Sequence, residues 1–163
     1  MRFTAQEEYG LRCLLQMARH EEEGGMAIPE IAKREGITTA YVGKLMRVLR
    51  EAGMVESTRG QKGGYRLAKP AERISLSEIL VSLGGEFYPK DHCNRYPGNE
   101  HVCVHNSDCS IRSAWMNLDI LLDRILGRVM LKDLLRSERA MADWLQGNAE
   151  NLVPRETLRA AGL

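Results

Sequence analysis

The stretch that decides the fold is ITTAYVGKLMRVLREAGMVESTRGQKGGYRLAKP, residues 37–70. Thr38 or Thr39 can cap a helix that runs to Ala52 and stops at Gly53. Apolar residues recur in this helix at the spacing of one buried stripe, namely Val42, Leu45, Met46 and Leu49. The opposite side carries polar and basic residues and is left free to contact a partner.

A shorter helix is expected before this stretch and a hairpin within it. Pro29 suits the first turn of a helix and Gly36 its end, which predicts a helix over 29–35. Residues 54–57 and 65–67 are expected strands, joined by a turn over 59–64 that is rich in glycine and positive charge. Two helices, a tight turn and a glycine-rich basic hairpin together predict a winged helix-turn-helix.

Two capping boxes place the remaining helices of this part of the chain. Thr4 with Glu7 opens a helix over about 5–20, and Ser75 with Glu78 opens one that runs through about Leu83. The expected fold class is mainly α, a winged helix-turn-helix domain with a small β-hairpin wing and a long dimerisation helix. Cys13 lies among apolar residues of the first helix and is expected in the core.

Basic charge is concentrated in the same stretch. The whole chain has a formal net charge of only +1, but residues 38–69 hold seven basic residues against two acidic ones. Such a patch favours DNA even when the net charge is near zero. The expected DNA-binding residues are those near the start of the second helix and in the wing turn: Thr38, Thr39, Tyr41, Lys44, Arg59 and Lys62. The alternative is that these are ordinary surface charges on a helical domain.

Composition narrows the class of protein further. No run of 18 apolar residues and no signal peptide is found, so we expect a cytoplasmic protein. Disulfides are rare in that compartment, and the cysteines therefore need another explanation. The histidines lack a paired nucleophile, so we do not expect an enzyme.

Three cysteines fall in or beside a long loop. Residues 86–108 show no periodicity, and Cys93, Cys103 and Cys109 are separated by nine and five residues. Soft thiolates favour zinc, copper(I) or an iron–sulfur cluster. The spacing is not the short Cys-x2-Cys of a zinc knuckle. A zinc site or a thiol redox switch remains an open alternative.

A strong helix is expected after the loop, over 110–126. Its wide apolar stripe must be buried somewhere, and consists of Ile111, Ala114, Trp115, Leu118, Leu121, Leu122 and Ile125. The expected organisation is a DNA-binding domain over 1–83, a cysteine-bearing loop over 84–109, a dimerisation helix over 110–135 and a C-terminal tail over 136–163.

Taken together, these motifs resemble the family of winged-helix regulators that contains IscR, NsrR and RirA. The most specific match is the wing Arg59-Gly60-Gln61-Lys62-Gly63-Gly64-Tyr65, preceded by Gly53-Met54-Val55. The resemblance also covers Met1-Arg2-Phe3-Thr4, the three cysteines and Trp115, and it runs to about Leu135. It implies a homodimer built on the long helix, and Cys93, Cys103 and Cys109 as ligands of an iron–sulfur cluster, [2Fe–2S] preferred over [4Fe–4S].

The chain departs from that pattern at the fourth ligand. IscR-like members have a histidine three residues after the last cysteine, where this chain has Arg112. NsrR-like members use an acidic residue near the start of the first helix, donated by the partner subunit, and Glu8 stands there. Glu8 is the preferred fourth ligand, although it equally suits a solvated charge in a first helical turn. His92, His101 and His105 are held in reserve.

The resulting functional expectation is a homodimeric DNA-binding transcription regulator that senses redox, iron or nitric oxide through its cluster. The alternative is a cluster-free regulator switched by thiol oxidation or by a protein partner. An electron-transfer ferredoxin would account for the cysteines but leaves the basic wing unexplained.

Overall fold

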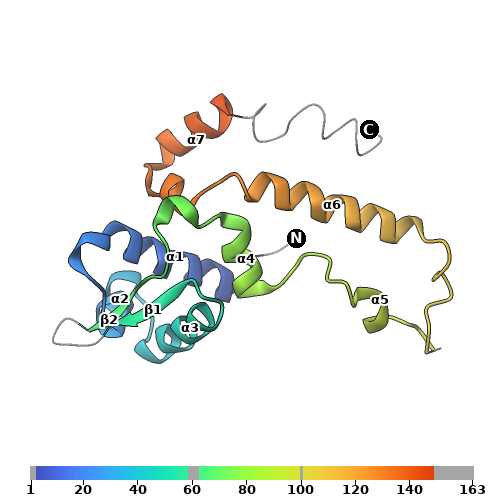
Figure 1. Ribbon diagram of the computed structural model, residues 1–163, viewed down its shortest axis with the longest axis horizontal. Coiled ribbons are helices and arrows are strands. Elements are labelled where there is room, and N and C mark those ends of the chain that lie inside the picture. The colour runs from blue at the N-terminus through green and yellow to red at the C-terminus, as the bar shows by residue number, and fades with distance from the viewer. Residues whose placement is uncertain (1–2, 59–62, 100, 149–163) are drawn as a thin grey trace.

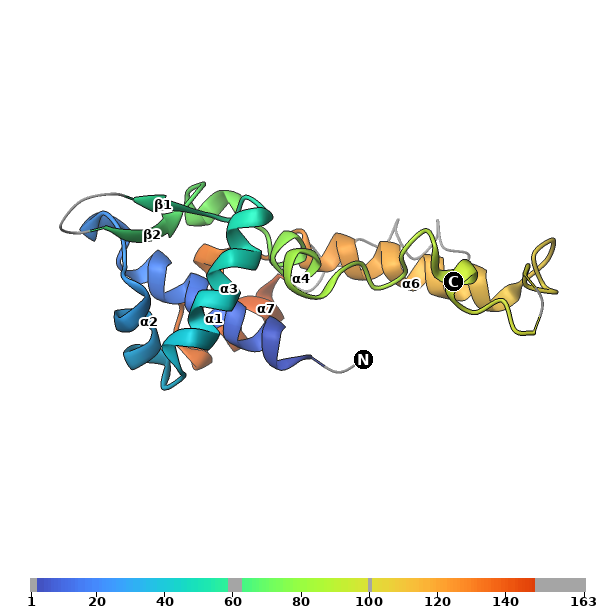
Figure 2. The same ribbon diagram turned by 90° about the horizontal axis from the view of Figure 1, so that it is seen from below.

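A helical body and a projecting arm make up the molecule (Figures 1 and 2). The structure is a computed structural model that describes residues 3–58, 63–99 and 101–148. The body contains α1 (Ala5–Arg19), α2 (Ile28–Glu35), α3 (Thr39–Glu51), β1 (Val55–Thr58), β2 (Gly64–Leu67), α4 (Leu76–Gly84) and α7 (Glu138–Gly147). The arm, residues 85–126, carries α5 (His92–Arg95) and α6 (Ser110–Leu126). None of the helices in the described ranges has the length and apolarity needed to cross a membrane.

Local sequence signals explain where the helices of the body begin. Thr4 and Glu7 form a reciprocal capping box at α1, and Ser75 and Glu78 form another at α4. The Thr38 hydroxyl accepts a hydrogen bond from the backbone N–H of Tyr41 at the start of α3. The predicted capping boxes and the predicted helix-turn-helix are therefore confirmed.

The core lies around α1, which packs against α2, α3 and α4. Cys13 is fully buried in it, as predicted. Completely enclosed side chains come from α1, α2, α3 and α4, among them Leu14, Ile31, Val42, Leu45, Met46, Leu49 and Ile79. Because the apolar stripe of α3 is buried in this core, the opposite side of the helix is exposed.

The wing is a two-stranded antiparallel hairpin in which Thr58 pairs with Gly64 and Val55 with Leu67. An added Cβ at Gly64 would lie 2.4 Å from the carbonyl oxygen of Met26. Met26 and Tyr65 exchange backbone hydrogen bonds of 2.8 and 2.9 Å, so the chain before α2 runs tightly along the hairpin. Glycine is needed at position 64 because another backbone passes there.

The chain returns to the body after α6. Backbone N–H groups of Leu76 and Leu131 bond to the carbonyls of Val129 and Ile74, both at 2.8 Å. Leu131 is fully buried and Val129 nearly so. This segment therefore closes the core of the body, and α6 is held to the body at its C-terminal end.

The arm differs from the expectation in one respect. The loop contains one helical turn, α5, which the aperiodic sequence did not predict. The apolar stripe of α6 was expected to be covered by a second copy of the chain, and none of the helix's residues is buried in this single chain. Ile111 is 62% exposed and Leu118 41% exposed, so the stripe is free to pack against another surface.

Candidate functional site

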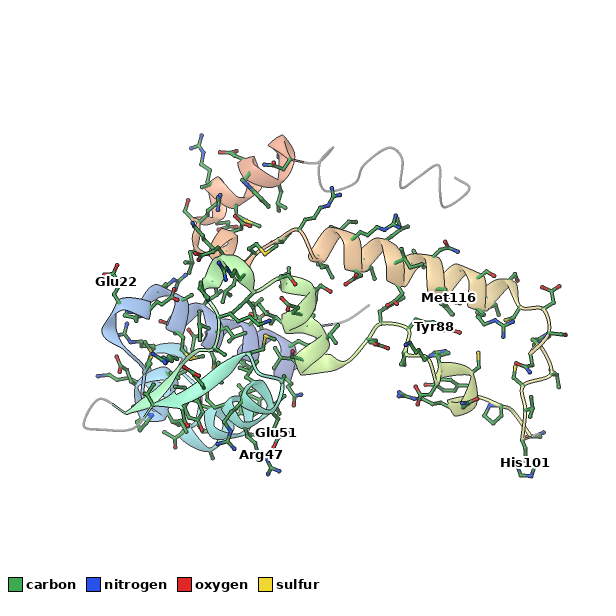
Figure 3. All side chains as sticks on the ribbon, in the orientation of Figure 1. Glu22, Arg47, Glu51, Tyr88, His101 and Met116 are labelled. Atoms are coloured by element: carbon green, nitrogen blue, oxygen red, sulfur yellow. The ribbon has the colours of Figure 1, made fainter. Side chains whose placement is uncertain are left out.

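The exposed side of α3 presents polar and basic groups. Thr38, Thr39 and Lys44 are exposed, and Tyr41 is half-buried. Arg47 forms an ion pair with Glu51 on the next turn, Nε to Oε1 at 2.9 Å (Figure 3). Lys44 makes no ion pair with any described residue. The cation nearest the start of the helix is thus available to a phosphate or a base edge.

Tyr41 is held in place by the first helix. Its ring lies edge-on to the ring of Tyr9, with centroids 5.9 Å apart. The guanidinium of Arg12 lies over the Tyr9 ring at 5.1 Å and donates from Nε to Glu35 at 2.6 Å. These contacts join α1 to both helices of the helix-turn-helix, so the position of α1 and that of α3 are coupled.

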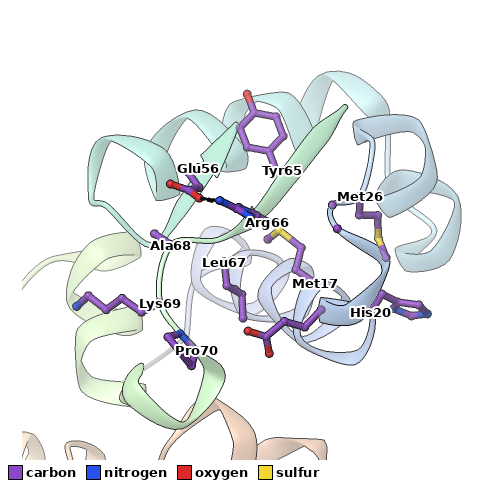
Figure 4. A pocket seen from close by; sticks show the side chains of 13 residues that line it. Met17, His20, Met26, Glu56, Tyr65, Arg66, Leu67, Ala68, Lys69 and Pro70 are labelled. Atoms are coloured by element: carbon purple, nitrogen blue, oxygen red, sulfur yellow. Dashed lines mark hydrogen bonds and ion pairs between the residues drawn. The ribbon is translucent and has the colours of Figure 1, made fainter. Parts of the chain in front are cut away.

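Two of the predicted wing residues, Arg59 and Lys62, lie outside the described part of the chain. At its base, Arg66 pairs with its cross-strand neighbour Glu56 at 2.6 Å. A hollow of about 230 Å³ lies beside this pair, between the strands and the end of α1 (Figure 4). Arg66 is therefore engaged within the hairpin.

The three clustered cysteines all lie on the arm and are half-buried. Cys93 belongs to α5, and Cys109 caps α6, where its sulfur accepts from the Arg112 N–H at 3.4 Å. The Cys103 carbonyl accepts from Asn106 N–H at 3.0 Å, and Arg112 Nη2 donates to the Asn106 carbonyl at 3.0 Å. Arg112 occupies the position at which IscR-like members have a histidine ligand. Its two hydrogen bonds connect the turn at Cys103 to the N-cap of α6 at Cys109.

The three thiols of the arm are of the type that binds a soft metal centre, although they do not form one metal-binding group in the described part of this single chain. Cysteine thiolates are the soft ligands that iron–sulfur clusters use, and these three cysteines lie outside the buried core. Among described residues no three or more His, Cys, Asp or Glu side chains form one potential metal group. The chemistry of the three thiols fits an iron–sulfur cluster.

The candidates for the fourth ligand are spread over the molecule. Glu8 is exposed in the first turn of α1, in the body and not on the arm. The His92 ring lies tilted against the rings of Tyr88 and Tyr96, with centroids at 4.6 and 5.0 Å. His101 and His105 are exposed, and His101 lies at the far end of the arm (Figure 3).

Sequence reasoning missed Tyr88. Its hydroxyl lies 3.4 Å from the sulfur of Cys93, and this hydrogen bond raises the pKa of Tyr88 above its ordinary value. The only signal in the sequence is an aromatic residue five positions before a cysteine in a polar loop. That signal is too weak to distinguish a partner of the thiol from a packing residue.

A groove of about 620 Å³ runs where the arm meets the body. It is lined by the start of α1, by α4, by Phe87 and by α6. Its apolar members include Phe3, Val81, Phe87 and Ile120, which are 41–65% exposed.

Comparison with known proteins agrees with this architecture. Residues 3–137 match the model of the Rrf2 family, described as "Iron-dependent Transcriptional regulator". The chain is 35% identical to Protein rrf2 of Nitratidesulfovibrio vulgaris over 157 residues, 96% of this chain and 99% of that protein.

Solved structures share the fold. The chain is similar to T. potens IscR, with 28% identity, a TM-score of 0.63, and coverage of 83% of this chain and 86% of that one. CymR, the global cysteine regulator of B. subtilis, shares the fold with a TM-score of 0.65 at 24% identity, over 83% of this chain and 96% of that one. The predicted winged helix-turn-helix and the predicted resemblance are confirmed. This chain belongs to the Rrf2 family of DNA-binding transcriptional regulators.

Proposed function

We propose that this regulator is cytoplasmic and homodimeric and that Cys93, Cys103 and Cys109 hold an iron–sulfur cluster, [2Fe–2S] in preference to [4Fe–4S]. The observation that carries the proposal is the donor set: three half-buried thiols on an arm outside the core, in a family described as iron-dependent. When bound, the cluster supplies a group that responds to redox state, iron supply or nitric oxide. Glu8 of the partner subunit is the proposed fourth ligand.

The proposed dimer covers α6. The helix is 17 residues long, and Ile111, Trp115 and Leu118, which share one side of it, are 40–62% exposed. A second copy laid along this side would bury them. Such a dimer would also bring the first helix of one copy toward the arm of the other, which is where Glu8 is needed.

The body's own contacts provide the proposed link to DNA. Glu8 belongs to α1, one residue before Tyr9, and Tyr9 and Arg12 contact α3 and α2. A change in what Glu8 binds would therefore move the helix-turn-helix relative to that of the other subunit. Two half-sites are read only at a fixed spacing, so a small shift alters affinity. The proposed base-reading residues are Thr38, Thr39, Tyr41 and Lys44, with Arg59 and Lys62 on the wing.

Oxygen-free purification tests the proposal. We expect coloured protein with iron and sulfide in the wild type, and none in a variant with Cys93, Cys103 and Cys109 all changed to serine. Cys13→Ala is the matched control and should keep the iron, because Cys13 is buried in the body. Colourless, iron-free wild-type protein would contradict the cluster and favour a thiol switch. Glu8→Ala should keep cysteine-bound iron but uncouple DNA affinity from redox state.

Sedimentation velocity tests the dimer separately. Leu118→Arg places a charge on the apolar side of α6 and should yield monomers. Asn117→Arg is the matched control, because Asn117 is an exposed polar residue that bonds its own helix at the Ser113 carbonyl. A dimer that survives Leu118→Arg would show that the two copies do not meet along this side.

A further inference from the structure

The side chain of Tyr88 contacts the sulfur of one of the proposed ligands. Its hydroxyl oxygen lies 3.4 Å from Cys93 Sγ, within hydrogen-bonding range for sulfur. The contact spans five residues because the chain turns between them: the His92 and Asn94 N–H groups bond to the Pro89 and Asp91 carbonyls, both at 2.9 Å. The pairing is thus built into the local fold of the loop.

Tyr88 is also fixed to α6. Its backbone N–H donates to Asp119 Oδ1 at 3.2 Å, and the neighbouring Phe87 ring lies edge-on to Trp115 at 6.3 Å. The His92 ring lies against the phenol ring with centroids 4.6 Å apart. Figure 3 shows Tyr88 on the limb of the arm that leaves the body, beneath α6. Tyr88 is therefore held through its backbone by α6 and through its side chain by the turn at α5.

The direction of the hydrogen bond follows from the proposed function. A cysteine that binds iron is a thiolate, which has lone pairs but no proton to give. The phenol must then be the donor. Hydrogen bonds to the sulfurs of a cluster stabilise the extra negative charge of its reduced form and so raise its reduction potential.

We propose that Tyr88 donates a hydrogen bond to the Cys93 thiolate, positions that ligand against α6, and raises the reduction potential of the cluster. The inference rests on the proposed function, since it needs a cluster at Cys93. It adds a residue that sets the redox threshold at which the regulator responds. It also gives the ligand a defined mechanical link to the proposed dimer helix.

The test compares Tyr88→Phe with Tyr96→Phe in full-length protein purified without oxygen. Tyr96 is the matched control: it lies on the same arm and touches the same His92 ring, but its side chain is 68% exposed. Its bond to Cys93 runs from its backbone N–H to the Cys93 carbonyl at 3.4 Å, and Tyr96→Phe leaves this bond in place. Iron and sulfide per chain, reduction potential by redox titration, and Fe–Sγ stretching frequencies by resonance Raman are measured on each.

Tyr88→Phe should show a lower potential and a higher Fe–Sγ stretching frequency, because losing the hydrogen bond returns electron density to the iron–sulfur bond. Tyr96→Phe should match the wild type in both. Loss of iron from Tyr88→Phe alone, with wild-type circular dichroism, also supports the role of Tyr88 in holding Cys93. Equal potentials and equal spectra in iron-loaded proteins overturn the inference alone, whereas iron-free wild-type protein overturns the proposed function itself.

Discussion

Glu35 at the end of α2 accepts a hydrogen bond from Nε of Arg12 on α1, at 2.6 Å. The Glu35 side chain is only 6% exposed, and Gln16 donates to its second oxygen. Arg12 also reaches the Glu35 carbonyl, at 3.2 Å. One carboxylate thus fixes two side chains of α1 against the first helix of the helix-turn-helix.

Glu35→Ala should lower the free energy of unfolding by about 1–3 kcal/mol, because it leaves two donors without their acceptor. Urea denaturation measures the change. Glu30→Ala is the control on the same helix: Glu30 pairs with Arg34 at 2.8 Å, but both side chains are well exposed, and the cost should stay within about 0.5 kcal/mol. Equal losses in the two variants would contradict the role given to Glu35.

The capping box at α4 predicts that the fold is less stable when Ser75 is replaced and when the pH becomes acidic. Ser75→Ala should cost about 1 kcal/mol, measured by urea denaturation, since it removes the acceptor for the Glu78 N–H. The Ser75 backbone N–H donates to Glu78 at 2.9 Å, and this bond lowers the pKa of Glu78 in the folded chain. A carboxylate with a lowered pKa stabilises the fold above its unfolded pKa, and this contribution disappears as the pH falls through the folded value.

Glu78→Gln should therefore have a lower melting temperature than the wild type at pH 7, and the gap should close at acidic pH, below the folded pKa of Glu78. Ser82→Ala serves as the control, because it removes a hydroxyl that bonds to the Glu78 carbonyl and adds no titrating difference. Its gap from the wild type should be the same at both pH values. A Glu78→Gln gap that does not shrink in acid would argue against the capping carboxylate.

The cysteines should separate into two classes on alkylation. Burial raises the pKa of the Cys13 thiol to about 12, so almost none of it is thiolate at pH 8, whereas the three cysteines of the arm are half-buried. Maleimide added to folded, iron-stripped protein should label three thiols, and a fourth only after unfolding in urea. Cys13→Ala should label three in both conditions. Four thiols reacting at one rate in native buffer would contradict the buried position.

Much of the body could be predicted from local sequence because its signals act locally. Thr4 with Glu7 and Ser75 with Glu78 define helix starts by their own hydrogen bonds, and the α3 stripe identifies its buried side. The four residues of α5 are too few to show a period, so the turn that brings Cys93 to Tyr88 has no sequence signature. Gly64 was predicted as a turn residue, but its close neighbour Met26 is distant in sequence and could be identified only from the fold.

The arm limits prediction for a different reason. The α6 stripe indicates that something covers the helix but carries no information on what that is, because any apolar surface would satisfy it. The same reason limits how far the cluster ligands can be predicted from the sequence. Cys93, Cys103 and Cys109 are recognisable by residue type, whereas a fourth ligand such as Glu8 depends on how two chains meet, which no spacing within one chain specifies.

Lys44 offers a test of the DNA-reading surface that does not require the operator. Binding to duplex DNA of any sequence has an electrostatic part set by the number of phosphates neutralised, and this number appears as the slope of log affinity against log salt. Lys44 is exposed on α3, so Lys44→Ala should weaken binding to a random duplex and reduce the steepness of the slope by about 1. Arg139→Ala removes the same charge from exposed α7 and should leave the slope unchanged. Fluorescence anisotropy at several salt concentrations measures both variants. A wild-type slope for Lys44→Ala would place the DNA elsewhere on the body, and a reduced slope for Arg139→Ala would extend the interface to α7.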